Sequence, residues 1–218
     1  MTLFDYFQIA SLIIFIVIVV TKAIYLRSTA GINAIVIGRG KKGFQLVFEF
    51  GAFAGLAVWI AEFVSYALQA KLHVFRAPLD MRLIDSDAAR IAGVVLISIG
   101  LVIFIWAFVS FGNSWRVGVD SQTPGALVTS GIFAHSRNPI YVFLDLWFAG
   151  IFLINGRLIF LIFMVLALAA LHYQMIREER FLSQRHGQEY EDYRSRTGRY
   201  FQFVSQRSGV GRVRNRER

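Results

Sequence analysis

The chain has 218 residues, of which 56% are hydrophobic and only 17% are charged, and its formal net charge is +9 at pH 7. Soluble domains usually have about a quarter of their residues charged, so this composition excludes an ordinary soluble globular protein. The absence of cysteine excludes disulfide bonds, thiolate nucleophiles and metal centres with cysteine ligands.

The apolar residues gather into five blocks, each with at most two formally charged side chains. A helix needs about 20 predominantly apolar residues to cross the hydrocarbon core of a bilayer, and lipid offers no hydrogen-bond partners to a backbone that is not helical. The fourth block is the shortest, with 16 residues. We therefore predict an all-α integral membrane protein with about five transmembrane helices and a cytoplasmic amphipathic helix near the C-terminus. The five blocks are 7–26, 44–68, 88–111, 139–154 and 158–176.

Basic residues set the predicted orientation. The loop 27–43 has four basic residues and no acid, and the tail from Arg177 onward is rich in arginine. The loop 69–87 has three basic and three acidic residues. Short basic loops stay in the cytoplasm. Five spans then place the N-terminus outside, and the loop 112–138 and the C-terminus in the cytoplasm.

We expect three parts along the chain. Residues 1–110 form three N-terminal spans, residues 111–200 form a cytoplasmic loop, a helical hairpin and an amphipathic helix, and residues 201–218 form a basic, disordered tail. Attraction of the tail to anionic lipid headgroups is favoured over binding to nucleic acid, because the tail follows a transmembrane helix. The histidines have no spacing typical of a metal site, so no metal is expected.

The first group of candidate site residues surrounds the start of the fourth block. Pro139 suits the first turn of a helix, and Asn138 or the preceding serine can cap it. Arg137 and Asn138 then lie at a helix N-terminus, which is a suitable site for a carboxylate or phosphate. Tyr141 and Asp145 follow on the same face. The alternative is that Arg137 only reaches toward the interface and that Tyr141 belongs to an aromatic belt. Asp145 argues against that alternative, because an acid within a span usually faces a bundle interior or a polar cavity.

The second group follows the last apolar block, where we expect the helix to continue past the membrane surface. Glu178 and Glu179 are adjacent there and could line a pocket at the membrane edge. The alternative is pairing of these acids with nearby arginines on a solvated helix. Further on, Tyr190 and Tyr193 contribute to an amphipathic stripe that could lie along the interface or fold back on the preceding loop.

These motifs, in this order, resemble those of the isoprenylcysteine carboxyl methyltransferase and phospholipid methyltransferase superfamily of integral membrane enzymes. The resemblance covers roughly residues 111–200. Asn138 stands where the family usually has histidine, and Ile132-Phe133 stands where it often has Pro-Tyr. The matching segments are Gly112-x-x-Trp115-Arg116, Gly131 followed by Arg137-Asn138-Pro139-Ile140-Tyr141, Glu178-Glu179-x-x-Leu182 and Gly187-x-x-Tyr190-x-x-Tyr193.

The resemblance implies a methyltransferase that uses S-adenosylmethionine (SAM) and a small or lipophilic acceptor at the cytoplasmic face. By this resemblance Arg137 would hold the SAM carboxylate, Glu178 or Glu179 the ammonium or ribose, and Tyr141 would face the sulfonium. An arginine would hold an anionic acceptor. The implied cofactor-binding residues are Gly131, Arg137, Asn138, Pro139, Tyr141, Glu178 and Glu179, and the implied catalytic residues are Arg116, Tyr141 and Arg194.

Two other functions compete with methyl transfer. Membrane reductases of the sterol reductase type share a similar C-terminal hairpin but use NADPH, and they are generally longer. A non-catalytic membrane scaffold would dock partners through its basic tail. The motif combination favours the methyltransferase, and it leaves open whether the acceptor group is a carboxylate, thiol, amine or hydroxyl.

Overall fold

The computed structural model describes residues 1–31, 43–112 and 126–201. These residues form helices, with no strand among them beyond a single antiparallel bridge between Arg82 and Arg157. The all-helical prediction is therefore confirmed. The elements in chain order are α1 (Leu3–Ala30), α2 (Phe44–Ala67), α3 (Asp87–Phe111), the short 3-10 helix η2 (Gly131–Ala134), α4 (Pro139–Asn155), α5 (Leu158–His186) and α6 (Gln188–Arg196).

Each of the five apolar blocks lies within one of the long helices, apart from the last residue of the second block. By length and composition α1, α2, α3 and α5 can each cross a membrane, and α4 is shorter, with 17 residues. Large apolar side chains on the outer faces of α1 and α3 are exposed, as expected for surfaces that meet lipid. The chain is a multi-pass membrane protein.

Local signals in the sequence explain where the helices begin and end. Thr2 and Asp5 form a reciprocal capping box at the start of α1, which satisfies two backbone donors. Pro139 occupies the first turn of α4, as predicted. Gly31 and Gly156 end α1 and α4 in the left-handed conformation, with φ of 64° and 62°, which glycine adopts without a steric penalty.

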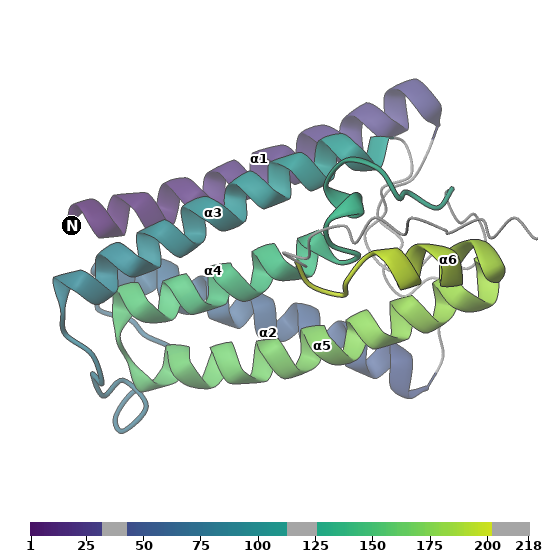
Figure 1. The fold of residues 1–218 in the computed structure, drawn as a ribbon. Coiled ribbons are helices and arrows are strands. Elements are labelled where there is room, and N and C mark those ends of the chain that lie inside the picture. Colours follow the sequence, from purple (N-terminus) through teal and green to yellow (C-terminus); the bar gives the residue numbers. More distant parts are fainter. Residues whose placement is uncertain (32–42, 113–125, 202–218) are drawn as a thin grey trace, which may run out of the picture.

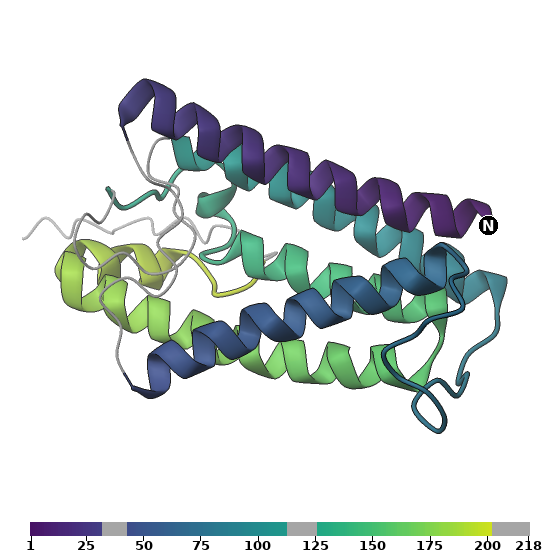
Figure 2. The ribbon, with the colours of Figure 1, turned by 180° about the vertical axis from the view of Figure 1, so that it is seen from behind.

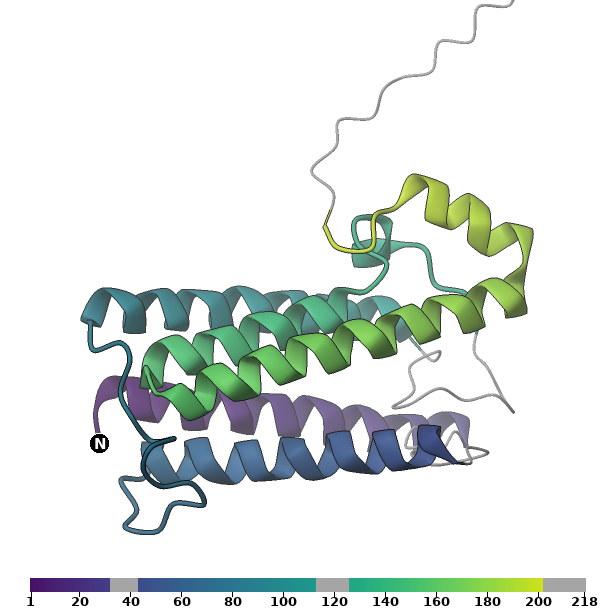
Figure 3. The same cartoon turned by 90° about the horizontal axis from the view of Figure 1, so that it is seen from below.

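The long helices run roughly parallel or antiparallel to one another (Figure 1). Helices α1 and α2 lie on one side of a layer formed by α3, α4 and α5 (Figure 3), and α2 crosses in front of α4 and α5 when the molecule is seen from behind (Figure 2). The core is aromatic: the rings of Phe104 and Phe143 are 4.5 Å apart and those of Trp59 and Trp147 are 5.4 Å apart. Helices α3 and α4 share the most extensive interface.

The two ends of the bundle differ in content. One end contains the N-terminus, the segment 68–86 and the α4–α5 turn, whereas the other contains the end of α1, the start of α2, η2, the start of α4 and α6 (Figure 1). Helix α5 continues past its apolar part to His186, as predicted, and thereby carries Glu178 and Glu179 to the second end. All the described motif residues from Gly131 onward lie toward that end.

Candidate functional site

A buried carboxylate is the centre of the site. Glu179, near the end of α5, has only 6% of its surface exposed. Its carboxylate accepts hydrogen bonds from Arg137 Nη2 at 3.1 Å and Asn138 Nδ2 at 2.8 Å, and from Arg199 Nη2 at 2.9 Å. We call these four residues the Glu179 cluster. Burial of a carboxylate is costly unless it is paired and hydrogen-bonded, and the three donors meet that requirement.

The chain after α6 is tied to the segment before α4. Arg137 N donates to Gly198 O at 2.9 Å, and Ser136 Oγ donates to Arg199 O at 3.3 Å. Asn138 Nδ2 also reaches Arg199 O, at 3.3 Å. The hydrogen bond to Glu179 raises the pKa of the Arg199 guanidinium above its usual value. These contacts bring three segments distant in sequence to one point.

The prediction that the Asn138 side chain caps α4 is wrong. Asn138 occupies the N-cap position, but its side chain makes no capping hydrogen bond. Its amide group is instead directed to Glu179 and to Arg199 O, while Ser136 Oγ accepts from Asn138 N at 3.2 Å. The amide of Asn138 therefore binds the Glu179 carboxylate and does not cap α4. A hydrogen bond to a charged group stabilises a protein more than one between neutral groups does.

Helices α4 and α5 carry further polar contacts beside the cluster. The Tyr141 hydroxyl lies beside the carboxylate of Glu178. One turn further, Asp145 lies near Tyr200, whose pKa is raised by burial and then by the Asp145 charge. The Tyr200 hydroxyl is 3.0 Å from His172 Nδ1. The predicted polar face of α4 therefore meets polar groups, and Asp145 Oδ1 is buried without a partner among the described residues.

Helix α6 folds back onto η2, which is one of the two predicted arrangements of the tyrosine stripe. Tyr190 and Tyr193 are buried with Ile132 and Phe133. The Tyr193 hydroxyl donates to Phe133 O at 2.7 Å, and burial raises its pKa. Burial also raises the pKa of Tyr190 to about 12, with a further contribution from the negative charge of Glu179. This packing fixes the chain that delivers Arg199.

A cavity of about 370 Å³ opens beside Glu179, between the end of α5 and α6. Its volume is within the range of about 300–1,000 Å³ that ligand pockets usually have. The Tyr190 hydroxyl is buried without a hydrogen-bond partner in the described part of the chain, as is Arg137 Nε. Such unpartnered donors are expected where a polar ligand completes the site. The residues that line this cavity are Ile176, Glu179, Arg180, Ser183, Gln184, Tyr190, Arg194 and Arg199.

The remaining predicted residues are spread around this centre. The Arg194 side chain lines the cavity and pairs with Glu191 at 3.4 Å, with 52% of its side-chain surface exposed. Its carbonyl oxygen accepts from Arg137 Nη1 at 3.1 Å. Gly131 begins η2 with φ of 63°, and a Cβ there would approach Ser110 Oγ to 2.3 Å. Arg116 lies outside the described residues.

Sequence reasoning missed Arg199 as a member of the site, and it considered Ser136 only as a helix cap. Arg199 lies 20 residues after Glu179, which is too far for a helical pairing rule to connect them. The alternative reading of the glutamates, pairing on a solvated helix, does not apply to Glu179 because its carboxylate is buried and its arginine partners come from other segments. No group of three acids or histidines in the described residues is arranged to hold a metal ion.

Comparison with known proteins adds the family to this geometry. No curated protein matches the chain significantly. The model of the phospholipid methyltransferase family matches residues 88–189, a range that contains α3 except its first residue, together with η2, α4, α5 and the start of α6. It therefore includes Arg137, Asn138 and Glu179. Over residues 88–189, somewhat less than half of its length, the chain is similar to the phospholipid methyltransferase family, which is part of a superfamily of integral membrane methyltransferases.

Proposed function

We propose that the protein is a SAM-dependent methyltransferase that acts on a lipophilic acceptor next to the Glu179 cluster. The observation that carries the proposal is the convergence of the family's matched segments on one buried polar cluster beside a cavity. The bundle offers apolar outer surfaces to the bilayer, which suits an acceptor that arrives through lipid. SAM supplies an electrophilic methyl group when bound.

The contacts refine the roles that the resemblance implies. Glu179 already accepts from three side chains, so we assign it to positioning Arg137 and Arg199 rather than to binding the cofactor's ammonium. Glu178, beside Tyr141, keeps the proposed role toward the ammonium or ribose. Arg137 retains an unpartnered Nε–H, and it keeps the proposed role toward the carboxylate. Fixed side chains of this kind promote transfer by orienting the reactants and excluding water.

Binding of SAM to the purified protein tests this proposal. We expect saturable binding by isothermal titration calorimetry, and we expect Arg137→Ala to weaken it at least about tenfold, because a hydrogen bond to a charged group contributes about 1.5–3 kcal/mol. The control is Glu189→Ala, an exposed acid on the same face of the membrane. Absence of SAM binding to the unmodified chain would contradict the function, and saturable NADPH binding in its place would favour a reductase. Unchanged affinity in Arg137→Ala would contradict the assigned role.

We further propose that the end with the Glu179 cluster faces the cytoplasm, because Arg27 in the last turn of α1 and the basic end of α5 lie there. The absence of cysteine allows a direct test with single-cysteine variants. In intact cells, a membrane-impermeant maleimide is expected to label Lys71→Cys, at the opposite end. It is expected to label Arg185→Cys only after permeabilisation. The reverse pattern would invert the proposed orientation.

A further inference from the structure

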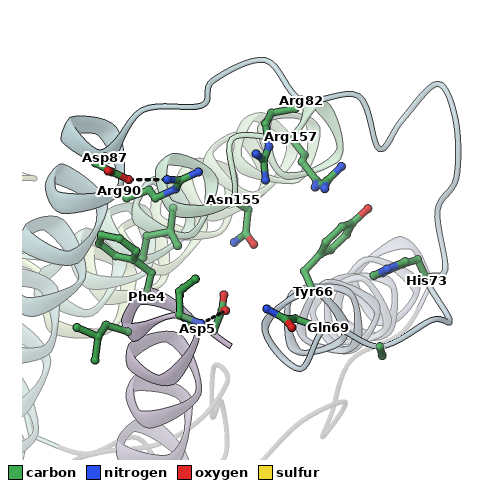
Figure 4. A pocket seen from close by; sticks show the side chains of 14 residues that line it. Phe4, Asp5, Tyr66, Gln69, His73, Arg82, Asp87, Arg90, Asn155 and Arg157 are labelled. Carbon is green, nitrogen blue, oxygen red and sulfur yellow. Dashed lines mark hydrogen bonds and ion pairs between the residues drawn. The ribbon is translucent and has the colours of Figure 1, made fainter.

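A second, larger cavity lies at the opposite end of the bundle (Figure 4). Its volume is about 630 Å³, and it is formed where the start of α1, the end of α2, the start of α3 and the α4–α5 turn meet. Helix α4 separates this cavity from the Glu179 cluster, and its 17 residues correspond to about 25 Å at 1.5 Å per residue. The cavity is therefore distinct from the proposed methyl-transfer site.

One wall of this cavity is held by backbone hydrogen bonds. Gly156 O accepts from Leu83 N at 2.7 Å and from Ile84 N at 3.0 Å. Gly156 has φ of +62°, and a Cβ there would lie 1.9 Å from Ile84 O, so this close approach requires glycine. The bridge between Arg82 and Arg157 continues the same contact. Two arginines are thereby held at adjacent positions on the rim (Figure 4).

Arg157 is a cation without a carboxylate partner in the part of the chain that the structure describes. Its Nη1 donates to the carbonyl oxygen of Asp80 at 2.5 Å, and its guanidinium lies 4.6 Å from the centre of the Tyr66 ring. A guanidinium has five N–H donors. The contact with the Tyr66 ring and the bond to Asp80 O leave N–H donors of Arg157 available, and its side chain lies at the edge of the cavity (Figure 4).

Two more arginines line the same space. Arg82 Nη1 pairs with Asp85 at 2.8 Å, and Arg90 pairs with Asp85 and with Asp87. Asp85 is shared by both arginines, and its pKa is lowered chiefly by the hydrogen bond from Arg82. The contacts described here use one N–H group of Arg82 and two of Arg90, so both guanidiniums have further donors available.

A buried N–H donor that has no partner in the described part of the chain also lies close to the cavity. Asn155, which lines the cavity, donates to Oε1 of the fully buried Gln8 at 2.6 Å. Gln8 Nε2 is left without a partner among the described residues. Of the two acids that line the cavity, Asp87 is bound to Arg90, and Asp5 accepts from Thr2 N in the capping box. Both acids that line the cavity are therefore engaged, whereas the three arginines keep further N–H donors.

We propose that this cavity binds a phosphate group, carried either by the headgroup of a membrane lipid or by inorganic phosphate. A phosphate offers several acceptor oxygens in a tetrahedral arrangement, which suits guanidiniums that approach from separate chain segments. A planar carboxylate has two oxygens and would satisfy fewer of them. Leu3, Phe4 and Ile154 also line the cavity, and they provide apolar contact for the glycerol and acyl region of a lipid.

Thermal unfolding of the full chain in detergent tests the site without reference to methyl transfer. Phosphatidylglycerol, diacylglycerol with the same acyl chains and inorganic phosphate are titrated separately. We expect phosphatidylglycerol or inorganic phosphate to raise the unfolding temperature, and the active ligand identifies the source. Diacylglycerol is expected to have no such effect. In Arg157→Gln, half-saturation should require about tenfold more ligand, because a charge-assisted hydrogen bond is lost.

Two further variants make the test decisive. Arg82→Gln is expected to weaken binding in the same way, and it removes only an exposed ion pair with Asp85, so its fold should be retained even if Arg157→Gln unfolds. Arg76→Gln is the matched control, because Arg76 is exposed in the same loop but does not line the cavity. The proposal is overturned if diacylglycerol matches phosphatidylglycerol, if neither phosphate compound stabilises the protein, or if Arg76→Gln weakens binding as much as Arg82→Gln.

Discussion

Replacing Glu179 with alanine is expected to lower the free energy of unfolding by about 3–5 kcal/mol, the usual cost of breaking a buried ion pair by removing one partner. The variant leaves the Arg137 guanidinium, with 8% of its side-chain surface exposed, without its carboxylate. Asn138 Nδ2 loses its shortest hydrogen bond as well. Arg199 contributes less to this cost, because its side chain is 34% exposed and solvent screens its charge. Thermal or denaturant unfolding in detergent measures the change.

The loss of stability in Glu179→Ala is expected to be greatest in the segment 197–201, which follows α6. Glu179 binds the Arg199 side chain directly and also binds the Asn138 amide that donates to Arg199 O. Limited proteolysis should therefore cleave Glu179→Ala after α6 faster than the unmodified chain. Glu179→Gln keeps one acceptor oxygen and should fall between the two. Glu189→Ala, whose carboxylate is 69% exposed, should behave as the unmodified chain. Equal stability of Glu179→Ala and Glu189→Ala would show that the cluster does not hold the fold.

The helices were predictable because their determinants are local. Uninterrupted apolar runs predicted each long helix, and Pro139 predicted the start of α4. The continuation of α5 past the apolar run was expected, and the structure extends it to His186. The number of helices that cross the bilayer stays a prediction, since α4 has 17 residues and is shorter than the others.

The site was predictable only in its members and not in its contacts. The motif identified Arg137, Asn138 and Glu179 as candidate ligand-binding residues, but it did not predict that the arginine and the glutamate also bind each other. The chain also folds back after Gly187, which adopts φ of 54°. The fold-back brings Arg199 to Glu179, and no periodicity in the sequence links residues from separate helices and a terminal segment.

The same limit applies to the second cavity. In the sequence, Arg82 belongs to a loop with no net charge, Arg90 to the third apolar block, and Arg157 to the turn after the fourth block. Charge balance alone gives no reason to expect a binding site there. In the structure the arginines differ in the groups that they contact. Arg90 binds two carboxylates, whereas Arg157 contacts a carbonyl oxygen and an aromatic ring. Which N–H groups of these arginines remain available depends on the three-dimensional contacts, and the composition of the chain does not predict those contacts.

Replacing Gly93 with valine is expected to lower the free energy of unfolding by about 3 kcal/mol, the upper part of the range for overpacked sites. A Cβ at Gly93 would lie 2.6 Å from the carbonyl oxygen of Gly150 and 2.8 Å from Ile154 Cγ1. The first of these atoms belongs to the α4 backbone, so a side-chain rotation cannot relieve the overlap. Helices α3 and α4 must separate, because small residues are what allow membrane helices to approach closely. Thermal unfolding in detergent measures the loss.

Glycines elsewhere in the bundle provide the matched control. Gly51 lies within α2, and a Cβ there would meet nothing within 4 Å. Gly51→Val should therefore change stability little, and Gly51→Ala should be neutral or stabilising by up to about 1 kcal/mol, since glycine weakens a helix interior. Gly150→Val should resemble Gly93→Val, and the double variant should cost less than the sum, because both changes separate the same two helices. Full additivity, or equal effects at Gly93 and Gly51, would contradict the close α3–α4 contact.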